Sequence, residues 1–237
     1  MHLGRRISTV MIGFGVFVAA CGGGDPSLDG EWLVEDAEVI IAASAEAMGL
    51  VTSVRFDLRH SGASVYIDPL ESLALEAVVG RFTVPAEADA LVTVFVNDSL
   101  KTELGAVALG PDVWLSNPIT GEFEPLPPGY NIDPRTFFDP RGGWQPLLAE
   151  LTDPVLIGVE DDRYHLTGTA TAERIEIVTA GLVSGRDVPV DLWIHPVTAL
   201  VTRVEFATTA DNGVSEWALE LSEYGEEFTI VVPGTDG

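Results

Sequence analysis

A single cysteine, Cys21, carries the most specific chemical signal in this chain. It ends the run Val18-Ala19-Ala20-Cys21, in which an aliphatic residue and two alanines precede the thiol. This run matches the bacterial lipobox, where a lipoprotein signal peptidase cuts just before the cysteine and the sulfur receives a diacylglyceryl group. We therefore expect Cys21 to be lipidated. The alternative is an ordinary signal peptide with a cysteine there by chance.

The residues before Cys21 have the layout of a secretory signal. Arg5 and Arg6 form a positive start, an apolar run covers residues 7–17, and small residues follow. The run is too short to cross a bilayer as a mature helix. We predict a lipoprotein signal peptide over residues 1–20. A glycine-rich lipidated tether over 21–30 and one folded domain over 31–237 are predicted to follow.

Lipidation would decide where the protein resides. Each buried methylene contributes about 0.8 kcal/mol, so one acyl chain binds a membrane reversibly, whereas two or more hold it firmly. We expect the mature chain, with palmitate as an acyl group, on the outer face of the cell membrane or elsewhere in the cell envelope.

Other reactive residue types do not form a recognisable catalytic pattern. The histidines are His2, His60, His165 and His195, and their spacing is not that of metal ligands. The chain has no Gly-x-Ser-x-Gly nucleophile elbow, P-loop or Gly-x-Gly-x-x-Gly. Carboxylates are abundant, but no spacing singles out a catalytic pair. We expect no enzyme activity, no metal and no cofactor.

Composition narrows the possible partners. The formal net charge is −25, and such an acidic surface repels phosphate backbones, so we expect no nucleic-acid partner. Cys21 is the only cysteine, which excludes internal disulfides and a thiolate metal site. The hydrophobic fraction of 46% is sufficient for a sizeable core.

Two stretches are predicted to be amphipathic helices. Residues 31–50 contain no proline and end at Met48-Gly49, and the apolar positions Val39, Ile40, Ala43, Ala47 and Leu50 recur at helical spacing. The stretch Trp144–Leu151 has Pro146 in its first turn, with Leu147, Leu148 and Leu151 on one side, and Asp153-Pro154 is expected to end it. A short helix is also predicted over Ala172–Ala180.

The remaining segments alternate between apolar and polar residues, which is typical of strands joined by turns. Strands are expected around residues 54–58, 73–84, 91–96, 100–109, 113–115, 155–159, 164–171, 188–194, 204–206, 217–221 and 228–232. The proline-rich stretch Pro118–Pro140 cannot be regular throughout. The order of elements predicts an α+β fold with a large antiparallel sheet and a few helices on one face.

Three stretches resemble the LppX/LprG-type lipoprotein family, also written LppX_LprAFG. Residues 45–56 resemble its first helix and strand, and Leu151-Thr152-Asp153-Pro154 with residues 164–169 resembles its middle. Residues 188–204 resemble a hairpin with the pattern "LP-aliphatic-LWID…T-x-LVR", although His195 stands where the family commonly has aspartate. The similarity covers nearly the whole mature chain, in the family's order.

The resemblance implies a strongly curved antiparallel half-barrel, similar in fold to the LolA/LolB lipoprotein carriers, with helices packed on its concave face. It further implies a non-enzymatic protein that holds the acyl chains of a lipid or glycolipid in an apolar cavity and carries or presents them across the envelope. Partners would be that lipid, the membrane through Cys21, and an envelope transporter. The candidate cavity residues are Val39, Ile40, Ala43, Ala47, Phe137, Phe138, Trp144, Leu147, Leu148 and Leu151.

Periodicity alone cannot distinguish a lined cavity from a filled core. An interaction or structural lipoprotein with a filled core is therefore the alternative. A surface hydrolase is a third reading, for which the sequence offers no candidate residues.

Overall fold

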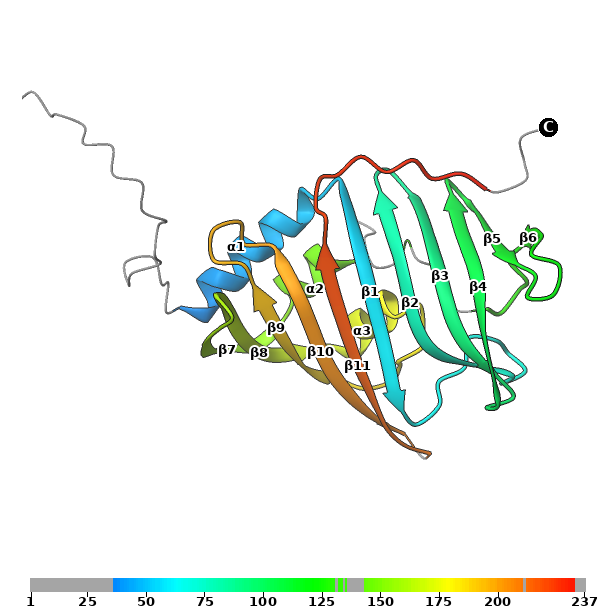
Figure 1. Cartoon of the computed structure of the whole chain (residues 1–237). Helices are drawn as coiled ribbons and strands as arrows, with labels where there is room; N and C mark the ends of the chain where they lie inside the picture. Colours follow the sequence, from blue (N-terminus) through cyan, green and yellow to red (C-terminus); the bar gives the residue numbers. More distant parts are fainter. Residues whose placement is uncertain (1–35, 131, 134, 136–142, 211, 233–237) are drawn as a thin grey trace, which may run out of the picture. The chain divides into compact units, whose positions relative to one another are not determined.

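The computed structural model describes residues 36–130, 132–133, 135, 143–210 and 212–232. The described strands form one antiparallel sheet in the order β6-β5-β4-β3-β2-β1-β11-β10-β9-β8-β7. The sheet is curved and open, and the helices lie on its concave side (Figure 1). The predicted α+β half-barrel is confirmed.

The strands follow one another as a meander that is interrupted by the helices. Their bounds are β1 Ser53–Gly62, β2 Leu73–Thr83, β3 Glu87–Val96, β4 Leu100–Leu109, β5 Asp112–Ser116, β6 Phe123–Pro125, β7 Thr152–Glu160, β8 Arg163–Ala170, β9 Val188–Ile194, β10 Val201–Ala210 and β11 Gly213–Ser222. The helices are α1 Ala37–Gly49, α2 Trp144–Ala149 and α3 Ala172–Val178. The first strand, β1, pairs with both β2 and the last strand, β11, which places it inside the sheet.

The alternation of side chains along the strands separates the two faces of the sheet. On β1, Val54, Phe56 and Leu58 are buried, whereas Arg55 and Arg59 between and after them are exposed. The buried row meets apolar side chains from all three helices in one hydrophobic cluster. Burying apolar surface stabilises the fold by roughly 25 cal/mol per Å². The core therefore lies between the concave face and the helices.

Capping side chains fix where two of the helices begin. The Asp36 carboxylate accepts hydrogen bonds from the backbone N–H groups of Glu38 (3.0 Å) and Val39 (3.4 Å) at the start of α1. Thr171 does the same for the N–H of Arg174 at the start of α3. Such caps satisfy donors that the first helical turn leaves free.

The predicted apolar face of α1 was wrong except at Ile40. The buried residues are Ile40, Ile41, Ser44, Ala45 and Met48. Val39 is 52% exposed and Ala43 is exposed, while Ala47 is half-buried. Alanines occur on every side of this helix, so the apolar pattern did not indicate which side would be buried. Packing in the core buries the side that carries the larger Ile41 and Met48 side chains.

Two further expectations about secondary structure were wrong. Asp153-Pro154 lies inside the edge strand β7 and not at the end of a helix. The register of β7 against β8 shifts between Thr152 and Val155, so the proline takes no place in the ladder. The stretch 228–232 is extended but is not a strand.

The stretch 228–232 instead packs on the outer face of the sheet (Figure 1). Ile230 and Val232 are buried against Val107, with Phe228 beside them, while Val231 is 61% exposed. The period of two therefore reflects an extended chain that presents alternate side chains to the sheet without pairing with it.

The described residues belong to one compact unit. Cys21 and the predicted signal peptide and tether lie outside the described residues, so the predicted boundaries remain predictions.

Candidate functional site

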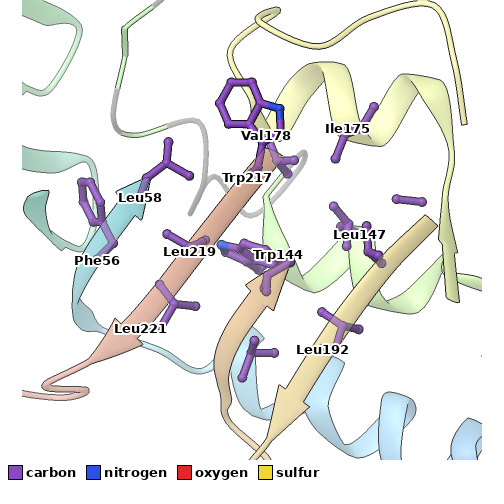
Figure 2. Packing of buried hydrophobic residues seen from close by; sticks show 14 of the residues in the cluster. Phe56, Leu58, Trp144, Leu147, Ile175, Val178, Leu192, Trp217, Leu219 and Leu221 are labelled. Atoms are coloured by element: carbon purple, nitrogen blue, oxygen red, sulfur yellow. The ribbon is translucent and has the colours of Figure 1, made fainter. Parts of the chain in front are cut away.

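An apolar cavity lies between the inner face of the sheet and the helices α2 and α3. Strands β1 and β11 contribute Phe56, Leu58, Trp217 and Leu219, and the helices contribute Trp144, Leu147, Ile175 and Val178 (Figure 2). Other strands add apolar side chains, among them Val78 of β2 and Val190 of β9. Strand alternation points all of these strand residues to the concave side.

The cavity is narrow in this conformation. The space not filled by atoms is about 880 Å³, including the part open to solvent, but the centre of a water-sized sphere can occupy only about 50 Å³ of it. A water needs roughly 10–15 Å³ by this measure, so the space corresponds to a few water molecules. A long hydrocarbon chain does not fit into this space as it stands.

Two of the polar side chains that line the cavity are hydrogen-bonded within the protein. The Thr179 hydroxyl donates to the carbonyl oxygen of Ile175 (2.7 Å) and accepts from the N–H of Val183 (3.1 Å). The Asp133 carboxylate accepts from Nε (2.9 Å) and Nη2 (2.6 Å) of Arg135. These bonds and the nearby negative charge raise the pKa of the Arg135 guanidinium. These two side chains therefore form part of the fold's own hydrogen bonding.

The two tryptophans that line the cavity differ from Thr179 and Asp133 in their hydrogen bonding. The indole nitrogens of Trp144 and Trp217 are buried and have no hydrogen-bond partner among the described residues. The side chains are 5% and 2% exposed, respectively. Trp217 is held from two sides, because its ring stacks on Phe206 at 5.6 Å and meets the His60 ring edge-on at 4.6 Å.

The predicted cavity residues are found in several environments. Trp144 and Leu147 line the cavity, whereas Leu148, Leu151 and Ile40 are buried in the surrounding core. Val39 and Ala43 are exposed and Ala47 is half-buried, so the expected row on α1 does not line this cavity. Phe137, Phe138 and Cys21 lie outside the described residues.

Most of the wall comes from strand and α3 residues that the sequence analysis did not propose as cavity candidates. Phe56, Leu58 and Leu219 lie in segments that were predicted as alternating strands, and Ile175 and Val178 lie in the helix predicted over Ala172–Ala180. The alternation identified their inward direction. It gave no sign that the space they face is incompletely filled.

The three described histidines each serve the local structure. His60 is buried on β1 with Nδ1 3.0 Å from the carbonyl oxygen of Leu75. His195 follows β9, and its Nδ1 accepts from the N–H groups of Val197 and Thr198. Within the described ranges, no group of three or more His, Cys, Asp or Glu side chains is arranged to hold a metal ion.

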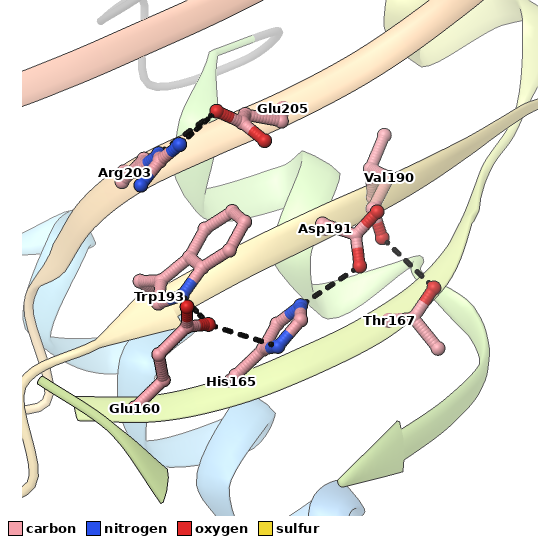
Figure 3. A network of polar contacts seen from close by, with 8 residues as sticks. All are labelled: Glu160, His165, Thr167, Val190, Asp191, Trp193, Arg203 and Glu205. Atoms are coloured by element: carbon pink, nitrogen blue, oxygen red, sulfur yellow. Dashed lines mark hydrogen bonds and ion pairs between the residues drawn. The ribbon is translucent and has the colours of Figure 1, made fainter. Parts of the chain in front are cut away.

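The third histidine, His165, belongs to a stack on the outer face of the sheet (Figure 3). Its ring lies parallel to that of Trp193 at 4.4 Å, and the Arg203 guanidinium covers the Trp193 ring at 4.6 Å. His165 also contacts Asp191 at 2.9 Å and Glu160 at 3.4 Å, and Trp193 Nε1 donates to Glu160 at 3.0 Å. These side chains point away from the cavity and bind one another.

Comparison with known proteins connects this geometry to a family. The model of the LppX_LprAFG lipoprotein family matches residues 36–230. A search of curated proteins found no match. Among the described residues, no helix is long and apolar enough to cross a bilayer.

Solved structures share the fold. LprF from Mycobacterium bovis is 18% identical with a TM-score of 0.65, and the match covers 83% of this chain and 96% of LprF. The lipoprotein LppX from Mycobacterium tuberculosis is 17% identical with a TM-score of 0.56, and 82% of this chain and 98% of LppX are covered. A LolA superfamily protein from Nitrosomonas europaea is 12% identical, with coverage of 81% and 94%, and its TM-score of 0.30 is too low to carry an argument.

Proposed function

This chain belongs to the LppX_LprAFG lipoprotein family, and on that premise we propose that it binds the hydrocarbon chains of a lipid or glycolipid in the cavity between its sheet and helices. It would carry or present that lipid across the cell envelope without acting as an enzyme. Lipidation of Cys21 would hold it at the outer face of the membrane, where an envelope transporter could exchange cargo with it.

The observation that carries the proposal is the apolar lining of the cavity. Its wall consists almost entirely of aliphatic and aromatic side chains, and the polar side chains Thr179 and Asp133 are already hydrogen-bonded. Such a wall offers a hydrocarbon chain the same driving force that packs the core, roughly 25 cal/mol per Å² of buried apolar surface.

For a lipid to enter, the helices have to move away from the sheet, and the short length of both helices favours such a movement. Both α2, with 6 residues, and α3, with 7, are short. Short elements with few buried side chains open at lower free energy than the strands of a continuous sheet. We propose that α2 and α3 move outward together when a lipid enters.

The first experiment is native mass spectrometry of the full-length chain carrying Cys21→Ser, purified gently from its own host. We expect an added mass that organic solvent releases as lipid. The variant Val78→Phe, which places a larger side chain in the cavity, should reduce the occupied fraction. Val79→Phe is the matched control, because Val79 is the next residue on β2 and points to the opposite face.

The narrow space of about 50 Å³ favours one other function, an interaction lipoprotein whose interior is filled. A bare polypeptide mass, unchanged after incubation with a host lipid extract, would support that function and contradict lipid binding. Equal loss of lipid in Val78→Phe and Val79→Phe would place the lipid outside the cavity.

A further inference from the structure

Two unpaired hydrogen-bond donors stand in the otherwise apolar wall. Trp144 extends from α2 and Trp217 from β11, and in Figure 2 both rings lie between strands and helices. Both indole nitrogens are buried and without a partner among the described residues. A buried N–H that makes no hydrogen bond costs free energy, so native proteins rarely keep one without a use.

Among the described residues, neither donor has an acceptor within hydrogen-bond distance. The carboxylate of Asp133 and the hydroxyl of Thr179 already have partners. A buried water needs two to four polar partners, and besides the indole groups the side chains of the wall offer it only these two groups, which are bonded within the protein. The acceptor that fits best is an oxygen atom attached to a hydrocarbon chain, because the chain can occupy the apolar space while the oxygen reaches the indole.

The rings are held in place and are suited to act as fixed donors. Trp217 is stacked on Phe206 and bounded by His60, and Trp144 is the first residue of α2, directly after the cap residue Gly143. A rigid aromatic donor loses little conformational freedom when it binds a ligand.

We propose that Trp144 and Trp217 are specificity-determining residues, whose indole N–H groups bind carbonyl oxygens of an acyl ester inside the cavity. The cavity would thereby prefer ester-linked chains to chains that lack a carbonyl. This inference rests on the proposed lipid binding. It adds that the cavity selects lipids by the carbonyl oxygen attached to their hydrocarbon chains.

A matched pair of ligands tests the selection. 1-Monopalmitoylglycerol and 1-O-hexadecylglycerol have the same chain length and the same free hydroxyls, and they differ in the ester carbonyl. Their affinities are measured on the full-length chain carrying Cys21→Ser. Because one neutral hydrogen bond changes affinity by roughly 2- to 12-fold, we expect the ester to bind more tightly by at least that factor.

Substitutions assign the preference to the two indoles. Trp144→Phe and Trp217→Phe keep an aromatic ring and remove the donor, so each should lower the ratio of ester to ether affinity, and the double variant should bring it close to 1. Trp193→Phe is the control, since that indole lies on the outer face and bonds to Glu160. It should leave the ratio unchanged.

A second measurement remains informative if a cavity variant does not fold. In ¹⁵N-labelled protein without these substitutions, the indole N–H resonances of Trp144 and Trp217 should shift downfield with the ester and less with the ether. Equal affinity for the two ligands, with equal indole shifts, would overturn the selection and leave lipid binding intact. Failure of both ligands to bind would overturn both proposals.

Discussion

Arg174 of α3 binds Glu150, the residue directly after α2, through two hydrogen bonds: Nε to Oε2 at 2.8 Å and Nη2 to Oε1 at 2.7 Å. The hydrogen bonds from Arg174 lower the pKa of the Glu150 carboxyl. This ion pair, the Arg174–Glu150 tie, links the two helices that cover the cavity.

Removing this tie should affect ligand exchange more than stability. In Arg174→Ala, we expect a bound fluorescent fatty-acyl probe to dissociate roughly 1.5- to 5-fold faster, as exposed ion pairs are weak. The Tm should fall by no more than about 3 °C. Stopped-flow displacement and calorimetry measure the two quantities. Lys101→Ala, which breaks the 2.8 Å pair with Glu76 away from the cavity, is the control and should leave the release rate unchanged. Equal rates in both variants would show that the helices do not gate the ligand.

The outer stack should contribute stability and nothing to binding. Trp193 is 6% exposed, with His165 on one face and Arg203 near its ring. Trp193→Ala should lower the free energy of unfolding by about 3 kcal/mol in urea titrations. Trp193→Phe should cost about 1 kcal/mol, because it retains a ring for stacking but loses the hydrogen bond to Glu160. A change in lipid affinity in either variant would contradict this assignment.

The C-terminal stretch offers two neighbouring residues with opposite environments. Ile230 is 6% exposed and packs on Val107, whereas Val231 is 61% exposed. Ile230→Ala should therefore lower the unfolding free energy by about 2 kcal/mol, and Val231→Ala should change it by less than about 0.5 kcal/mol. Chemical denaturation of the two variants measures the difference. Similar losses would mean that this stretch does not dock on the outer face.

Buried His60 should make stability depend on pH. Desolvation lowers the pKa of His60 below its usual 6.5, against the opposing effect of its hydrogen bond to the Leu75 carbonyl. The unfolded chain therefore takes up this proton at higher pH than the folded protein. The stability contribution is complete above about pH 6.5 and is lost as the pH falls through the lower folded value.

The variant His60→Gln isolates this effect, because glutamine keeps an amide donor and does not titrate. Unfolding free energies of both proteins are measured by urea titration between pH 7.5 and pH 5. The original protein should lose more stability than the variant over that range. Parallel curves would show that His60 does not titrate differently on folding.

Much of the fold was predictable because it rests on local periodicity. The alternation of apolar and polar residues over 188–194 predicted β9 with its correct bounds, and the helix predicted over Ala172–Ala180 contains α3. Where the pattern was weak, the prediction failed. On the alanine-rich α1 it selected Val39 and Ala43, and the sheet selected Ile41 and Met48.

The sequence by itself determined most of the strands and helices, which strand side chains share a face, and the lipobox around Cys21. Only the tertiary structure decided that Trp144 and Trp217 line one cavity, that their indole nitrogens have no partner in the described part of the chain, and that Ile230 packs on the outer face. The reason is physical. Periodicity fixes the direction of a side chain relative to its own element, whereas a cavity depends on how well residues distant in sequence fill the space between elements.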